Sequence, residues 1–252
     1  MHGKNAASSV RSALVRKLDG YARLTEEHKD LIDELVAQDV REFTEKQDIL
    51  RDGERPDHIH LIVDGWAARY KIQDDGSYFI VALLVPGDFC DLHTTVLSRM
   101  DHGIMALTDC KVSRVDSDRL DDLITQNNRL TKALWWMTLV DEAVLRQWVI
   151  NASRRTPMAI AHLLCELHLR LRAVDLVKDR CFDLPLTQVE LGECTGASVV
   201  HINRSLKKLR DNGLIEPRHD SIYIPDVAAL EEAASFDDAY LHLRKGTPRR
   251  HE

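Results

Sequence analysis

The chain has 252 residues, with 34 Lys or Arg against 41 Asp or Glu, so its formal net charge is −7. Hydrophobic residues at 44% and charged residues at 30% are ordinary for a globular protein and exclude a disordered or low-complexity chain. No apolar stretch approaches the roughly 18–20 residues of a membrane span, and five cysteines without a Cys-x-x-Cys pair argue against a disulfide framework or a zinc finger. We therefore expect a cytoplasmic protein that does not engage a membrane.

The negative charge, which taken alone argues against nucleic-acid binding, is unevenly distributed. Residues 152–252 carry 15 basic and 15 acidic side chains, so the whole acidic excess lies in residues 1–151. Within the C-terminal part, residues 198–218 carry five Lys or Arg against two Asp or Glu. Because a phosphate backbone responds to the local field, this short basic segment is compatible with DNA binding.

The N-terminal half predicts a β-rich sensor domain over residues 21–125, after an N-terminal tail of residues 1–20. A helix capped by Thr25 opens it. Turn glycines then follow at spacings of 12, 11 and 11 residues: Gly53, Gly65, Gly76 and Gly87. The apolar segments around them predict strands over Ile59–Val63, Trp66–Ile72, Tyr78–Val85, Gly103–Ala106 and Cys110–Val115. Short strands at this even spacing favour a small β-roll that can enclose one ligand.

A long helix over residues 126–152 is predicted next, because this stretch contains no Gly or Pro. Apolar residues recur at helical spacing and are assigned to a dimer contact: Leu130, Leu134, Met137, Val144 and Trp148. Trp135, Trp136, Leu139 and Val140 extend the apolar surface to further sides of the helix. A helix that is apolar on more than one side needs more than one partner, so we expect one side on the roll and the other on a second copy of the chain. A simple core helix is the alternative.

Residues 153–225 predict a winged helix-turn-helix. Thr156-Pro157 restarts a helix as its N-cap and first residue. A capping box from Thr187 to Glu190 opens a short helix that Gly196 ends, and a second helix, Val199–Asp211, follows directly. Two further apolar segments, Leu214–Arg218 and Ile222–Ile224, flank a tight turn and predict a β-wing. Residues 226–252 are expected to add a helix packed on the same domain and a tail ending near Arg249-Arg250-His251.

The second helix separates its residues by face, with Ile202, Leu206 and Leu209 toward the core. The opposite side is predicted to contact base edges through Val200, His201, Asn203 and Arg204. Phosphate contacts are expected from Lys207, Lys208 and Arg218, and the helix-starting residues Thr187 and Ser198 complete the predicted DNA-binding set. A solvated basic helix face would carry the same charges. The capping box, glycine turn, basic helix and wing in this order favour DNA binding.

At this point the chain resembles the Crp/Fnr family of bacterial transcription regulators, named after the cyclic-AMP receptor protein and FNR. The resemblance covers about residues 20–225 and rests on these segments: Asp48–Glu54 with Pro56, Ile62–Gly65, Val85–Phe89, Thr187–Gly192, Gly196–Ser198 and Arg204–Ile215. It implies an α+β chain with a jelly-roll (double-stranded β-helix) domain like those that bind cyclic nucleotides, a dimerisation helix and a winged helix-turn-helix. It also implies a homodimer on a pseudo-palindromic DNA site, an effector in the roll, and contact with RNA polymerase if the protein is an activator.

Two departures from the family pattern bear on the effector. Cyclic-AMP binders carry a Gly-Glu pair and a later Arg-Ser pair, where this chain has Asp91-Leu92 and Met100-Asp101, with Arg99 one place off. An acidic residue repels a phosphate, so we expect no cyclic-AMP binding. The FNR branch holds an iron–sulfur cluster on N-terminal cysteines, but the first cysteine here is Cys90, so we expect neither that cluster nor another cofactor.

The effector pocket is predicted to involve these residues: Asp88, Asp91, His93, Arg99, Asp101 and Leu145. Four of the polar residues in this region, Asp91, His93, Asp101 and His102, could form a metal, heme or pH-sensing site. Polar loop residues are the simpler interpretation, so no metal ligand is assigned.

Two other functional classes fit parts of the sequence. A metal-binding cupin would use His58-x-His60, but Cys90 stands where its later His belongs. A ligand-binding protein whose wing domain contacts protein would share the same domains. No catalytic residue is predicted, so we expect no enzyme. Oxidation of Cys194, on the first helix of the helix-turn-helix, is a further hypothesis.

Overall fold

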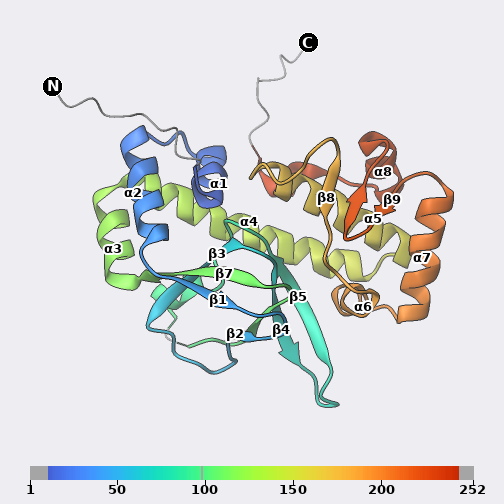
Figure 1. Ribbon diagram of the computed structural model, residues 1–252, viewed down its shortest axis with the longest axis horizontal. Coiled ribbons are helices and arrows are strands. Elements are labelled where there is room, and N and C mark those ends of the chain that lie inside the picture. Colours follow the sequence, from blue (N-terminus) through green and yellow to red (C-terminus); the bar gives the residue numbers. More distant parts are fainter. Residues whose placement is uncertain (1–10, 98, 244–252) are drawn as a thin grey trace, which may run out of the picture.

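The computed structural model describes residues 11–97 and 99–243, and Figure 1 shows a β-roll and a helical C-terminal domain connected by one long helix. That helix, α4 (Asn128–Ala152), runs across the molecule from the N-terminal helices to the C-terminal domain. In the part of the chain that the structure describes, no helix is long and apolar enough to cross a membrane.

The β-roll is built from two antiparallel sheets. Its strands are β1 (Val40–Phe43), β2 (Asp48–Leu50), β3 (His58–Asp64), β4 (Ala67–Ile72), β5 (Tyr78–Leu84), β6 (Gly103–Ala106) and β7 (Cys110–Asp116). One sheet has the order β1-β7-β3 and the other the order β2-β6-β4-β5. Ile59, Ile62 and Ile104, none of them exposed, form part of the core of the roll. Burial of such side chains stabilises each by about 1.5–3 kcal/mol.

The predicted turns and five predicted strands of the roll are confirmed to within two residues. All four turn glycines have positive φ between 81° and 90°. At Gly65 a Cβ atom would also lie 2.3 Å from the carbonyl oxygen of Asp109, so this position excludes any side chain. The strands β1 and β2 were not predicted, because β1 is largely exposed and polar at Arg41 and Glu42, and β2 has only three residues.

The N-terminal boundary was wrong. Residues 13–20, predicted as part of a tail, lie in helix α1 (Ala13–Tyr21), whose Leu14, Leu18 and Tyr21 are buried. These apolar residues have helical spacing, but a helix of 9 residues is too short to be stable alone, and packing on α4 stabilises it. The next helix, α2 (Glu26–Ala37), begins at Thr25 as predicted. Residues 1–10 lie outside the described residues.

The long helix starts later than predicted, because a separate helix, α3 (Ser117–Gln126), precedes it. Asn127 stands between the two helices with φ −129° and ψ 85°. Its side-chain amide donates to the carbonyl of Leu123 at 2.9 Å, and its Oδ1 lies 3.0 Å from the ring of His28. These contacts hold Asn127 in a non-helical conformation and so separate α3 from α4. The break was not predicted, because no Gly or Pro marks it in the sequence.

The residues predicted for the dimer contact pack within their own chain. Leu130, Leu134, Met137 and Val144 are buried, because α1, α3 and the C-terminal segment cover this side of α4. Trp148 is half-buried and donates its Nε1–H to Glu166 at 3.2 Å. The apolar side chains of α4 that remain exposed are Trp135, Leu139, Leu145, Val149 and Ile150.

The C-terminal domain combines helices with a small sheet. Its elements are α5 (Thr156–Arg172), β8 (Cys181–Asp183), α6 (Gln188–Thr195), α7 (Val199–Asp211), β9 (Glu216–Arg218), β10 (Ser221–Tyr223) and α8 (Val227–Ala234). The strands form a sheet in the order β8-β10-β9, and the turn between β9 and β10 is the predicted wing. Arg155, not Thr156, is the N-cap of α5.

The segment after the wing was predicted to pack on its own domain only. In the structure it packs on α4 as well. Helix α8 lies against α5, but the following 3-10 helix η2 (Asp238–Leu241) packs on α4. Leu241 is 1% exposed and joins the apolar cluster formed by α1, α4 and the roll. The tail beyond Leu243 lies outside the described residues.

Candidate nucleic-acid interface

The helix-turn-helix is formed by α6 and α7. The hydroxyl of Thr187 accepts from the backbone N–H of Glu190 at 3.2 Å, while Glu190 accepts from the N–H of Thr187 at 2.7 Å, as in the predicted capping box. Gly196 ends α6 in the left-handed region, with φ 68°. Ser198 then caps α7, so both predicted hydroxyls act as helix caps in this structure.

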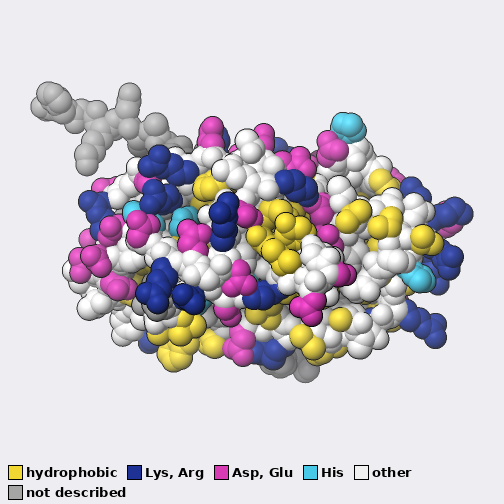
Figure 2. All heavy atoms as spheres, turned by 90° about the horizontal axis from the view of Figure 1, so that it is seen from below, with side chains coloured by type: hydrophobic (Ala, Val, Ile, Leu, Met, Phe, Trp, Pro, Cys, Tyr) yellow, Lys and Arg dark blue, Asp and Glu magenta, His cyan; other side chains and the backbone are white. Residues whose placement is uncertain are grey.

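Helix α7 presents a polar, basic side to solvent. Ile202 and Leu209 are buried beneath it, whereas Val200 is 66% exposed. The other predicted base and phosphate contacts on this helix are also exposed: His201, Asn203, Arg204, Lys207 and Lys208. Figure 2 shows Lys and Arg side chains gathered at the end of the molecule where α7 lies.

The Lys and Arg side chains on the exposed side of α7 differ in whether a carboxylate pairs with them. Lys207 lies 3.3 Å from the carboxylate of Asp211, an exposed pair one helical turn apart. The side chains of Arg204 and Lys208 have neither an ion pair nor a hydrogen bond with the residues that the structure describes. Two cations on the exposed side are therefore free to meet phosphates or base edges.

The wing adds a second basic surface. The guanidinium of Arg218 lies over the ring of Tyr223, 4.0 Å from its centroid, and Arg180 lies 5.3 Å from the same centroid. Arg180 also donates to the hydroxyl of Tyr223 at 2.9 Å. Arg218 was predicted. Arg180 was not, because it comes from the loop before β8 and reaches the wing only in the folded domain.

A cavity of about 790 Å³ lies between the roll, α1, α4, α5 and the C-terminal segment. Four predicted pocket residues line it: Asp88, His93, Asp101 and Leu145. The other two predictions were wrong. Asp91 is fully buried behind the cavity wall, where it accepts from the backbone N–H and ring of His60 at 2.6 and 2.8 Å, and the exposed Arg99 is not part of the lining.

The polar wall of the cavity is a set of buried ion pairs. Asp88 pairs with Lys17 of α1 and, at 2.8 Å, with Arg170 of α5. Burial alone raises the pKa of the Asp88 carboxyl, but the two cations outweigh it and lower that pKa to about 2. Asp88 therefore stays ionised and holds α1 and α5 on the roll.

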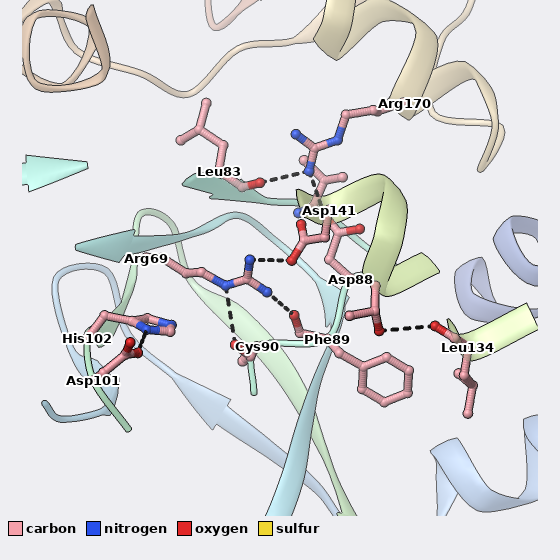
Figure 3. A network of polar contacts seen from close by, with 12 residues as sticks. Arg69, Leu83, Asp88, Phe89, Cys90, Asp101, His102, Leu134, Asp141 and Arg170 are labelled. Atoms are coloured by element: carbon pink, nitrogen blue, oxygen red, sulfur yellow. Dashed lines mark hydrogen bonds and ion pairs between the residues drawn. The ribbon is translucent and has the colours of Figure 1, made fainter. Parts of the chain in front are cut away.

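A second ion pair connects the roll with α4. Arg69 of β4 pairs with Asp141 of α4 and donates to the carbonyls of Phe89 at 3.0 Å and Cys90 at 3.3 Å, as Figure 3 shows. Arg69 is buried but the side chain of Asp141 is 41% exposed, so solvent screens this link in part. Sequence reasoning missed Lys17, Arg69, Asp141 and Arg170 in the pocket, because four separate elements supply them.

The cupin hypothesis has no support in the structure. His60 is buried and bonded to Asp91, whereas the ring of His58 lies 2.9 Å from the guanidinium of Arg114, a cation that opposes a metal ion. The oxidation hypothesis for Cys194 is also unsupported. Burial, together with the neighbouring Glu193, raises the pKa of its thiol well above the usual value and disfavours the reactive thiolate.

Family models match both domains of the chain. A cyclic nucleotide-binding domain model matches residues 40–127, which hold the roll, and a Crp-like helix-turn-helix domain model matches residues 159–233. The chain belongs to the Crp/Fnr family of transcription regulators. The helix-turn-helix geometry and the exposed basic side of α7 are those that this family requires for contact with DNA.

Similar family members cover most of the chain. The transcriptional activator protein FnrL of Cereibacter sphaeroides is 26% identical over 204 residues, which cover 78% of this chain and 81% of that protein. The transcriptional activator protein anr of Pseudomonas aeruginosa is 25% identical over 210 residues, covering 82% and 84%. Both are named as activators of transcription.

Solved structures share the fold. FixK2 from Bradyrhizobium japonicum superposes with a TM-score of 0.67 at 19% identity, over 77% of this chain and 96% of that one. A putative cyclic nucleotide binding protein from Ruegeria pomeroyi gives a TM-score of 0.60 at 18% identity, over 89% and 98%. The order of roll, long helix and helix-turn-helix is thus a known arrangement.

Proposed function

We propose that this Crp/Fnr-family protein regulates transcription as a homodimer that binds a pseudo-palindromic DNA site, one α7 helix to each half-site. The observation that carries the proposal is the exposed side of α7, where the side chains of Arg204 and Lys208 have no ion-pair or hydrogen-bond partner among the described residues. Unpaired cations on an exposed helix are positioned to exchange counterions for phosphates. The named activators among its relatives support the same function, with RNA polymerase as a partner if this protein also activates.

Within α7 we assign two roles. Arg204 donates to the O6 and N7 atoms of a guanine, and Asn203, His201 and Val200 contact neighbouring base edges. Lys207 and Lys208 bind phosphates, joined from the wing by Arg218. Because the hydroxyls of the two helix caps are already used within the protein, the helix N-termini are left to meet phosphates through backbone N–H groups.

The second copy is proposed to dock on the exposed side of α4. On this side Trp135 and Leu139 form one exposed apolar segment, and Val149 and Ile150 form another, with Trp135 and Val149 66% and 75% exposed. The exposed ion pair of Glu142 with Arg146 lies between the two segments. Two such surfaces brought together would bury these side chains in a two-stranded contact between the protomers.

An effector is proposed to act through the cavity. The cavity touches α4 through Asp141 and Leu145 and α5 through Arg170, so a molecule bound there contacts both sides of the hinge near residues 151–156. Cyclic AMP is a poor candidate, because the cations Lys17 and Arg69 are already paired with carboxylates. Reorientation of the C-terminal domains about this hinge would set the spacing of the two α7 helices.

Selection from fragmented genomic DNA tests the proposal. The purified full-length protein should enrich fragments that share a pseudo-palindromic sequence, and the enrichment should fall steeply as salt rises. A variant with Lys207→Ala and Lys208→Ala should enrich far less. Binding that is absent, or that does not change with salt, would contradict the proposal and favour a ligand-binding protein whose wing domain contacts protein.

A further inference from the structure

Three potential metal ligands converge on the wall of the cavity. His93 comes from the 3-10 helix η1 (Leu92–Thr95), and Asp101 and His102 from the loop before β6. One ligand atom from each of the three lies within 4.8 Å of the others, and the two imidazole rings have centroids 5.4 Å apart. Figure 3 shows Asp101 and His102 close to Arg69. Sequence alone favoured polar loop residues, but this convergence requires another explanation.

The two imidazoles each leave a polar atom unexplained. The Nε2 atoms of His93 and His102 are buried and have no hydrogen-bond partner among the described residues. A buried polar atom without a partner loses its hydrogen bonds to water and gains none in return, so native structures rarely leave two of them side by side. A bound ion would use the lone pair of each nitrogen.

The carboxylate of Asp101, beside the two imidazoles, also favours metal binding. Oδ1 of Asp101 lies 2.6 Å from Nδ1 of His102, so this nitrogen donates and the lone pair of the ring is directed to Nε2. Such a carboxylate–histidine pair orients the ring and strengthens it as a ligand in metal sites. The position of Asp101 is also restrained through its backbone, because its carbonyl oxygen accepts a hydrogen bond from Nζ of Lys71 at 2.6 Å.

The chemistry of these groups favours a divalent transition-metal ion. Two imidazoles suit zinc and its first-row neighbours rather than calcium or magnesium, which prefer oxygen ligands. Two protein ligands leave further coordination positions open toward the cavity.

We propose that His93 and His102, with Asp101 as the supporting carboxylate, bind a divalent transition-metal ion of the zinc type in the wall of the cavity. The ion would lie beside the Arg69–Asp141 pair that connects the roll with α4. The metal site itself does not depend on DNA binding. Any influence of the ion on DNA affinity rests on the proposed function.

The test is metal binding by the full-length protein, with Zn²⁺ measured by calorimetry and Co²⁺ by its visible absorption. We expect one ion per chain. His93→Ala and His102→Ala should each weaken binding by at least tenfold, and Asp101→Asn by roughly 10–100-fold, the usual effect of removing a supporting carboxylate. Zn²⁺ should also raise the Tm of the wild type, but not of the two histidine variants.

A closely matched pair in the same domain provides the control. Asp57 and His58 are also consecutive, and their Oδ1 and Nδ1 atoms lie 2.8 Å apart, but no third ligand converges on them in the described chain. His58→Ala should therefore bind Zn²⁺ as the wild type does. Wild-type protein that binds no ion at micromolar concentration, or variants at 93 and 102 that bind like the His58 variant, would overturn the proposal. Circular dichroism of each variant establishes that it is folded.

Discussion

Asp88 connects the roll with two helices, because its buried carboxylate pairs with Lys17 of α1 and Arg170 of α5. Removing one partner of a buried ion pair leaves an uncompensated charge and typically costs about 3–5 kcal/mol. We predict a loss of this size in the free energy of unfolding for Asp88→Ala, measured by urea denaturation.

The exposed pair of Asp52 with Lys71 is the control for that experiment. Solvent screens an exposed pair, so Asp52→Ala should cost less than about 1 kcal/mol. Equal losses in the two variants would mean that the Asp88 pairs contribute no more than a surface contact.

His162 predicts how stability depends on pH. It is buried in α5, with its ring 4.9 Å from that of Phe236, and burial, assisted by Arg154, lowers its pKa to about 4. In the unfolded chain a histidine has a pKa of about 6.5, so on acidification the unfolded state takes up a proton first. The free energy of unfolding should therefore fall between about pH 6.5 and pH 4.

Urea denaturation at pH 7 and pH 5 measures this effect. His162→Leu should lose part of the pH dependence, whereas the exposed His219→Gln should keep it. A wild-type slope that persists unchanged in His162→Leu would assign the pH dependence to other groups.

At the scale of elements, local chemistry decided what could be predicted. The capping box at Thr187, the left-handed Gly196 and the serine cap of α7 are contained within a few residues, and the structure confirms all three. Turn glycines located the strands of the roll for the same reason. Helix α1 and the break at Asn127 were missed, because packing on α4 and a hydrogen bond from the distant His28 stabilise them.

The cavity shows even more clearly that contacts between distant parts of the chain could not be predicted from local sequence. Four of the residues predicted for an effector pocket line the cavity, because they lie in or beside the sequence after the Pro86-Gly87 turn or on the long helix. Lys17, Arg170 and Leu241 come from parts of the chain more than 70 residues apart, and no sequence pattern joins them. The side chain of Asp91 was predicted to face the pocket, but it points away from it to His60. Strand pairing of β3 with β7 sets the position of His60, and the sequence near Asp91 does not reveal it.

The exposed side of α4 predicts the state of assembly. A charge introduced into a buried apolar contact is strongly destabilising, so Leu139→Glu or Val149→Glu should convert a dimer into a monomer. Light scattering coupled to gel filtration measures the mass. Lys111→Glu, an exposed cation of strand β7 in the roll, is the control. Dimers that persist in both apolar variants would locate the contact elsewhere.

For the whole molecule, the distribution of charge predicts the salt dependence of DNA binding. Lys207, Lys208 and Arg218 give six proposed phosphate contacts in a dimer. With about 0.9 counterions released per contact, the logarithm of the binding constant should fall with the logarithm of salt concentration with a slope of roughly −5. Lys208→Ala, present twice, should reduce that slope by roughly 2 units, as measured by fluorescence anisotropy. An unchanged slope would remove Lys208 from the phosphate contacts.

The most direct test of the account is the discrimination between the selected DNA site and random DNA by Arg204→Ala. If α7 reads base edges, this variant should lose about 1–3 kcal/mol of affinity for the selected site in each half and little for random DNA. Arg23→Ala, an exposed cation of the N-terminal region, changes the net charge equally and should bind both as the wild type does. Equal losses on both DNAs would show that Arg204 binds phosphate and would contradict base reading by this helix.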